Sequence, residues 1–221
     1  VAALEGAGAQ GVVLTPSDEA DNAALLQAGR VCPLPYTWLF PWARPGREAV
    51  DALARLVRAH RPHIAGLKLH ASLEQVWLDD PRWDPVFELA DAEGLALILH
   101  TGRWQQAAGY PLALARARAF PRVRHILSHA GGDTPELTLG AADAVVQQRL
   151  DNVAFDMAGV REHWALQRAI ARAGHERYMM GSDYPLAPPA MYIAQVRAMG
   201  LPGRITDALL GAAGLGDIGE H

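Results

Sequence analysis

Short apolar runs alternate along the chain with longer segments whose apolar residues recur every three or four positions. The short runs are rich in β-branched residues and predict buried strands, whereas the longer segments predict amphipathic helices. The expected strands are Gly11–Thr15, Val31–Tyr36, Ile64–His70, Leu95–His100, Val123–His129, Val153–Met157 and Arg177–Asp183. The expected helices are Asp18–Gly29, Gly46–His60, Pro81–Glu93, Pro111–Phe120, Glu136–Leu150, Glu162–Ala173 and Ala187–Met199.

This alternation predicts an α/β fold with parallel strands covered by helices, because each parallel crossover needs a long connection. Two architectures satisfy it, a (β/α)8 TIM barrel and a doubly wound sheet. We favour the barrel because the units continue without a linker, and because the turn Pro16–Asp18 lacks a glycine-rich nucleotide-binding fingerprint. Residues 1–221 are expected to form a single domain. The Val1–Gly8 segment has a helical pattern, so strand 1 of the barrel is expected upstream of Val1.

The composition narrows the class of protein. With 20 Lys and Arg against 24 Asp and Glu, the formal charge is −4, which offers no basic surface for a nucleic acid. Cys32 is the only cysteine, so neither an internal disulfide nor a four-cysteine zinc module can form, and a cytoplasmic location is expected. No apolar run approaches the roughly 20 residues of a membrane span, so no membrane interaction is expected. A small-molecule substrate is the expected partner.

Four predicted strands end in side chains that can bind a metal: His70, His100, His129 and Asp183. In a barrel of this kind the active site lies at the carboxyl ends of the strands, so these side chains are expected to converge. Imidazole and carboxylate groups are ligands for Zn²⁺ and Mn²⁺. A metal-bound water has a pKa of about 7, and a nearby carboxylate can take its proton. The pattern therefore predicts a hydrolytic site.

Five segments carry these residues, in the order GLKLHASLEQVWLDDPRW, LILHTG, ILSHAGG, NVAFDMAG and ERYMMGSDYP. Their order and spacing resemble the amidohydrolase superfamily, specifically its amidohydrolase 2 branch of metal-dependent TIM-barrel hydrolases. The resemblance implies that His100 and Asp183 bind a divalent metal, zinc before manganese. It implies that His129 binds the metal or polarises the substrate, and that Asp183 is also the general base. The H-x-H metal pair of that family does not occur in this sequence and is expected before Val1.

Lys68 and His70 lie two residues apart on one predicted strand, so both face the barrel interior. The resemblance implies that this pair anchors the substrate, or that Lys68 is carbamylated and bridges two metals. An ion pair between Lys68 and Asp156 is the structural alternative.

Three further residues are expected to bind substrate. Arg103 can clamp a carboxylate with its paired donors and Trp104 can cover an apolar ring, although a solvated arginine fits the pattern as well. Tyr184, directly after Asp183, completes the expected substrate-binding set.

Two segments between strands also stand out. Gly131–Gly132 predicts a tight loop, because glycine accepts backbone angles that other residues avoid. The proline-rich stretch Pro33–Pro45 is expected to be a long loop that carries Trp38 and Trp42. These tryptophans either form a lid or pocket wall, or pack the loop onto the barrel or a second subunit.

The sequence thus favours a metal-dependent hydrolase of a small carboxylated substrate, an amide, lactone or related compound. A non-oxidative decarboxylase of the same branch is the first alternative. A metal-free lactonase and a catalytically degenerate binding barrel are the others. A homodimer is implied by the resemblance alone.

Overall fold

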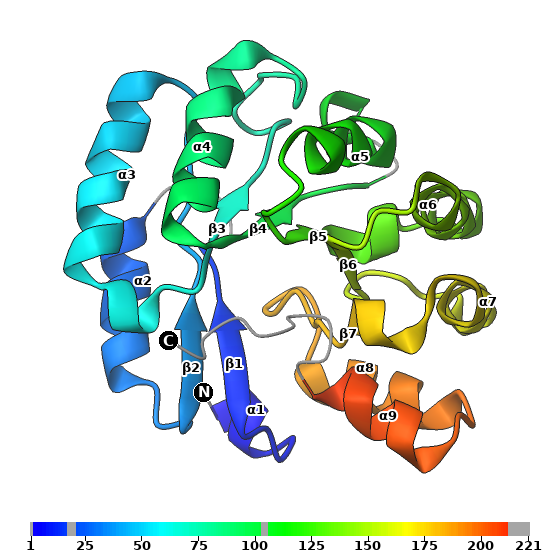
Figure 1. The fold of residues 1–221 in the computed structure, drawn as a ribbon. Coiled ribbons are helices and arrows are strands. Elements are labelled where there is room, and N and C mark those ends of the chain that lie inside the picture. Colours follow the sequence, from blue (N-terminus) through cyan, green and yellow to red (C-terminus); the bar gives the residue numbers. More distant parts are fainter. Residues whose placement is uncertain (1, 17–20, 103–105, 212–221) are drawn as a thin grey trace.

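The computed structural model describes residues 2–16, 21–102 and 106–211. Parallel strands alternate with helices that lie outside them (Figure 1). The strands are β1 (Gly11–Leu14), β2 (Tyr36–Leu39), β3 (Gly66–Leu69), β4 (Ala96–Leu99), β5 (His125–Leu127), β6 (Val153–Asp156) and β7 (Tyr178–Met179). The helices are α1 (Ala2–Glu5), α2 (Asn22–Val31), α3 (Arg47–Ala59), α4 (Asp84–Glu93), α5 (Tyr110–Ala119), α6 (Pro135–Gln148), α7 (His163–Ala173), α8 (Pro189–Ala198) and α9 (Gly203–Leu210). Short 3₁₀ helices are η1 (Arg61–His63), η2 (Pro81–Trp83), η3 (Gln106–Ala108), η4 (Ser128–Gly131) and η5 (His175–Arg177).

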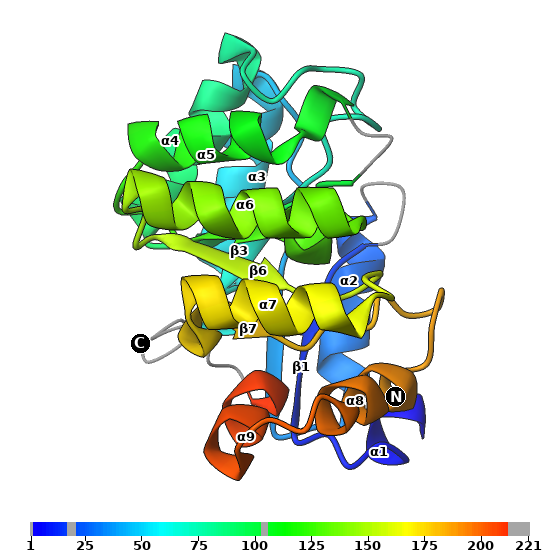
Figure 2. The same cartoon turned by 90° about the vertical axis from the view of Figure 1, so that its right-hand side faces the viewer.

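The strands follow one another in chain order, as in a TIM barrel. One sheet has the order β3-β4-β5-β6-β7 and a second is the pair β1-β2. Two isolated bridges, Leu39 to Ile64 and Trp42 to Lys68, join β2 to β3. Within the described ranges, β1 pairs only with β2 and β7 only with β6. The curved sheet carries its helices on the convex side (Figures 1 and 2), which confirms the expected α/β barrel class.

The two faces of the curved sheet bury different clusters. Residues 96 and 98 of β4 pack in a small inner cluster, whereas Leu97 and Leu99 pack with the helices. This alternation follows from the two-residue period of a strand. The inner cluster consists of Phe40, Ala65, Ala96, Ile126, Ala154 and Met179. Apolar side chains thus fill the lower part of the barrel, and polar side chains occupy the carboxyl ends above them.

Only a glycine fits at position 66 in this interior. A Cβ at Gly66 would lie 2.0 Å from a ring carbon of Phe40 and 2.5 Å from the Ala96 carbonyl oxygen. The ring of Phe40 therefore occupies the space that a side chain on β3 would need.

The second strand was expected at Val31–Tyr36, and this expectation is wrong. Val31 ends α2, and the strand runs from Tyr36 to Leu39. The reason is that Pro33 and Pro35 have no backbone N–H to donate to a neighbouring strand, so the ladder starts after the second proline. The tryptophan-containing stretch is accordingly a strand and its extension, with Trp38 inside β2.

Other differences concern the element ends. The last strand, expected at Arg177–Asp183, is limited to Tyr178–Met179 because the chain leaves the sheet after two paired residues. Helix α2 begins at Asn22, where the Asp21 side chain accepts a hydrogen bond from the Ala24 N–H. Helix α9 was not predicted, although Ile205 and Leu209 are spaced for one apolar stripe. Within the described ranges, no helix has the length and apolar character needed to cross a membrane.

Candidate active site

Three of the predicted strand-end histidines meet above the inner cluster. His70 follows β3, His100 follows β4 and His129 follows β5. The rings of His70 and His100 stack with centroids 3.8 Å apart. The ring of His129 meets that of His100 edge-on at 4.9 Å. We call these three side chains the histidine cluster; they converge because the carboxyl ends of parallel strands share one rim.

Lys68 lies beside the histidine cluster on the inner face of β3, as its spacing from His70 predicted. Its Nζ lies 3.4 Å from Ser128 Oγ. Burial lowers the pKa of the Lys68 amine, and the carboxylates of Asp156 and Asp183 partly offset this. Among the 20 Lys and Arg residues Lys68 is the only lysine.

Two members of the histidine cluster are neutral at pH 7. Burial, with a smaller effect of the Lys68 charge, lowers the pKa of His70 to about 4. The same two causes, burial first, hold the pKa of His100 far below its ordinary value. The Nδ1 atom of His70 accepts a hydrogen bond from the Leu73 N–H at 3.3 Å, so the ring proton of His70 lies on Nε2.

His129 sits in a strained turn. Its φ is +56°, and Ala130, Gly131 and Gly132 also have positive φ. This confirms the tight loop predicted for the two glycines. Non-glycine residues rarely adopt such angles, and they persist where the surroundings compel them. Here Thr101 Oγ1 donates to the Ser128 carbonyl.

Asp183 and Tyr184 follow β7. Asp183 has a φ of +52° and an exposed side chain. Tyr184 is 60% exposed and precedes a cis peptide bond to Pro185. Arg103 and Trp104, expected to bind substrate, lie outside the described residues.

Trp42 packs onto the barrel against the histidine cluster, which is one of the roles expected for it. It is 2% exposed and its ring stacks on His70 at 5.8 Å. Its Nε1 donates to Glu74 Oε1 at 2.7 Å. The side chain of Asn22 bonds both backbone groups of Trp42, at 2.7 and 3.1 Å. Sequence reasoning missed Asn22 and Glu74 because no local pattern links them to Trp42.

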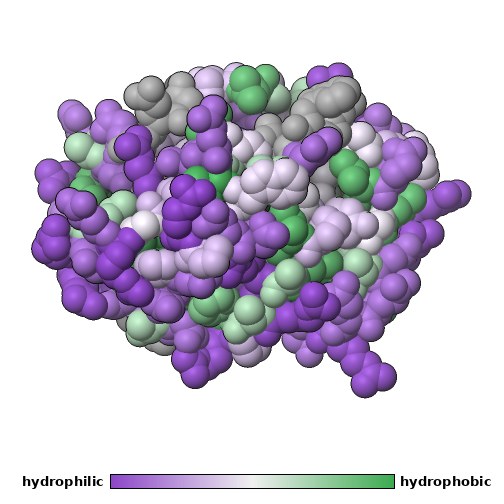
Figure 3. Space-filling model, turned by 90° about the horizontal axis from the view of Figure 1, so that it is seen from above, coloured by the Kyte–Doolittle hydropathy of each residue, from purple (hydrophilic) through white to green (hydrophobic). Residues whose placement is uncertain are grey.

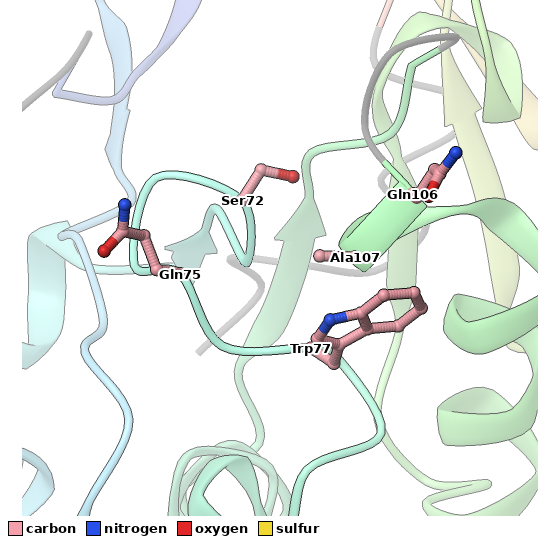
Figure 4. A pocket seen from close by; sticks show the side chains of 5 residues that line it. All are labelled: Ser72, Gln75, Trp77, Gln106 and Ala107. Carbon is pink, nitrogen blue, oxygen red and sulfur yellow. The ribbon is translucent and has the colours of Figure 1, made fainter.

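A separate open cavity of about 390 Å³ lies beside the loop that follows β3 (Figure 4). It is lined by Ser72, Gln75, Trp77, Gln106 and Ala107. None of these five described residues is charged. The face seen in Figure 3 is largely polar, and its hydrophobic residues form small separate patches rather than one apolar surface.

Comparisons with known proteins agree with this architecture. A family model described as Amidohydrolase matches residues 3–212. No protein with curated annotation matches the sequence.

Three solved structures illustrate the shared fold. A 2,6-dihydroxybenzoate decarboxylase from Rhizobium has a TM-score of 0.74 and 14% identity, over 96% of this chain and 84% of that chain. A putative 2-pyrone-4,6-dicarboxylic acid hydrolase from Pseudomonas putida has a TM-score of 0.71 and 22% identity, over 95% and 82%. A 5-carboxyvanillate decarboxylase from Novosphingobium aromaticivorans, complexed with manganese and 4-hydroxy-3-methoxy-5-nitrobenzoic acid, has a TM-score of 0.71 and 16% identity, over 96% and 77%. These similarities establish the fold, a TIM barrel.

Proposed function

Because the chain belongs to the amidohydrolase family, we propose that it is an enzyme that hydrolyses a small carboxylated substrate, such as an amide or a lactone, at the rim of its barrel. The observation that carries this proposal is the histidine cluster beside a partly buried cation, Lys68. The ammonium group beside the neutral imidazoles of His70 and His100 attracts a carboxylate strongly, because water screens the charges poorly inside the barrel.

The substrate carboxylate is proposed to bind Lys68 and His70. Tyr184 is exposed at the same rim and is proposed to contact the rest of the substrate. Arg103 and Trp104 are proposed as further binding residues, on their sequence position after the β4 histidine alone.

The proton steps are assigned to His129 and Asp183. The Nδ1 atom of His129 faces the carbonyl oxygen of Ala158, so its Nε2 can accept a proton from a water or orient that water. Asp183 is the proposed general base. The water oxygen bonds to the substrate carbonyl carbon, the C–N or ring C–O bond breaks, and the proton passes to the leaving atom.

A divalent metal, zinc or manganese, is the cofactor that the family implies, and His100, His129 and Asp183 remain its predicted ligands. The described residues, as they are arranged, do not fit a divalent metal ion. Within the ranges that the structure describes, no three His, Cys, Asp or Glu side chains are placed to hold an ion. The steps above therefore use protein groups alone.

Non-oxidative decarboxylation is the second candidate. Two of the three structural neighbours described above are decarboxylases of aromatic acids. The same Lys68 and histidine cluster would bind such an acid, and proton transfer to the ring carbon would replace the attack of water.

A substrate panel tests the proposed function. The purified protein is incubated with lactones, amides and aromatic acids, while products and carbon dioxide are measured. We expect hydrolysis without carbon dioxide, and a KM about tenfold or more higher in Lys68→Met, since a charge-assisted contact is lost. Carbon dioxide release without lactone or amide turnover would contradict hydrolysis and support the second candidate. Substrate binding without any turnover would support a degenerate binding barrel.

The same panel is repeated after chelation and after addition of zinc or manganese. We expect turnover to persist in the chelated protein. Activity that rises in proportion to one bound metal per chain would contradict the metal-free steps and show that the three predicted ligands rearrange around an ion.

A further inference from the structure

The ring of His129 is held by a turn that follows the next strand. Its Nδ1 lies 2.8 Å from the carbonyl oxygen of Ala158, 29 residues away in the sequence. A carbonyl oxygen only accepts hydrogen bonds, so Nδ1 must donate. In the neutral ring Nε2 is then unprotonated. The position of this one carbonyl selects the tautomer of His129.

Hydrogen bonds from two sides hold the turn at residues 157–160 in place. On the side of β6, Asp156 Oδ1 accepts a hydrogen bond from the Ala158 N–H at 2.8 Å. On the other side, the hydroxyl of Tyr192 accepts a hydrogen bond from the Gly159 N–H at 2.7 Å. Gln195 Nε2 donates to the Val160 carbonyl at 2.9 Å.

Tyr192 and Gln195 both belong to α8, three residues apart, and therefore lie on one face of that helix. Tyr192 is only 5% exposed, so packing fixes its ring and the hydroxyl has a defined position. Helix α8 thus holds the turn that orients His129, although Tyr192 and Gln195 lie more than 60 residues after that histidine in the chain.

The turn leaves no space for adjustment. Gly159 has a φ of +77°, and a Cβ at this position would lie 2.8 Å from Nδ1 of His129. The backbone of Gly159 therefore packs directly against the imidazole, and any shift of the turn moves the ring.

The geometry points to Tyr192 as a positioning residue for His129. Through Gly159 and Ala158, its hydroxyl keeps the proton of His129 on Nδ1 and presents Nε2 to the barrel rim. The catalytic consequence rests on the proposed function, whereas the effect on the tautomer does not.

Tyr192→Phe, with ¹⁵N-labelled histidine, tests the inference by NMR. The His129 signals are assigned by their loss in His129→Asn. We expect the variant to lose the well-defined Nδ1–H tautomer, with its ¹⁵N shifts moving toward those of exchanging tautomers. If the proposed hydrolysis is measured, kcat falls about fivefold to tenfold with KM unchanged, because one hydrogen bond is lost and the substrate carboxylate is not touched.

Tyr178→Phe is the matched control. Tyr178 is also a buried tyrosine, and its hydroxyl has no hydrogen-bond partner among the described residues. It should leave the His129 signals unchanged. Unchanged His129 signals in Tyr192→Phe would overturn the inference whatever the activity. A shifted tautomer in a protein that hydrolyses nothing would leave the inference standing and contradict only the proposed function.

A glycine pair provides an independent measurement. Gly159→Ala places a methyl group against His129, whereas Gly200→Ala imposes a similar positive φ, +63°, with no atom within 4 Å. Both variants lose stability through backbone strain. Only Gly159→Ala should shift the His129 ¹⁵N signals, and equal signals in the two variants would contradict the role of the turn.

Discussion

Lys68 has an unusual environment for a lysine side chain. It is a cation on the inner face of a sheet, and burial would favour its neutral form if no acid were near. Asp156 and Asp183 supply the compensating charge, and Ser128 lies within reach of its amine. Burial has the larger effect, so the pKa of the amine is lowered.

Reductive methylation with ¹³C-formaldehyde measures this pKa directly, because Lys68 carries the only lysine amine of the chain. We expect one dimethyl-lysine signal that titrates below the ordinary value of 10.5. The signal is followed by ¹³C NMR over an alkaline pH series. The same protein in concentrated urea is the control, where the amine should titrate at its ordinary value. A folded-state pKa at or above 10.5 would contradict the environment described.

At the scale of single elements, β3 illustrates how a strand serves both the core and the site. Its inward positions are Gly66 and Lys68, and its outward leucines pack with the helices. Gly66 makes room for Phe40, which closes the barrel interior below the polar rim. The outward leucines follow the strand period, whereas the inward glycine is required by a ring that lies just after β2.

Gly66→Ala is expected to destabilise the protein by at least about 1–3 kcal/mol, because the new methyl meets both a ring and a backbone carbonyl that cannot move aside. Urea denaturation measures the change. Gly203→Ala, at the start of α9, is the control, since nothing lies within 4 Å of its Cβ and stability should not fall. Equal stability of the two variants would show that the ring of Phe40 moves aside at little energetic cost.

For the whole molecule, the buried histidines make stability depend on pH. His125 is buried on the outer face of β5, stacked on Phe87, and burial lowers its pKa to about 4. His70 has a pKa of about the same value. Both pKa values are lower in the folded state than in the unfolded chain, where histidine titrates near 6.5. The unfolded chain therefore binds more protons between these values, and stability falls as the pH falls from about 6.5 to 4.

His125 contributes on the order of 3 kcal/mol to this loss, and the less buried His70 contributes less. We expect the free energy of unfolding, measured in urea at several pH values, to be constant above about pH 6.5 and to decline below it. His125→Phe keeps the stacking on Phe87 and removes one titrating group, so its decline should be shallower. A variant with the same slope as the parent protein would show that His125 does not titrate as described.

Much of the candidate site followed from strand order alone. Parallel strands in a curved sheet bring their carboxyl ends to one rim, so His70, His100 and His129 had to become neighbours once each was placed at a strand end. The inward direction of Lys68 followed from its two-residue spacing from His70. The predicted position of β2 was wrong because the apolar residues of Val31–Tyr36 favour a strand, whereas the two prolines within that segment prevent one.

The sequence by itself determined the alternation of strands and helices, the barrel class and the rim that carries the chemistry, since these depend on periods within one segment. Only the tertiary structure decided which ring nitrogen of His70 and of His129 carries the proton, that Trp42 packs against the cluster, and that α8 holds the turn behind His129. These features are hydrogen bonds and ring contacts between segments that lie far apart in the chain, such as Trp42 and Glu74. No local pattern records such contacts, because their geometry exists only after the strands and helices have packed together.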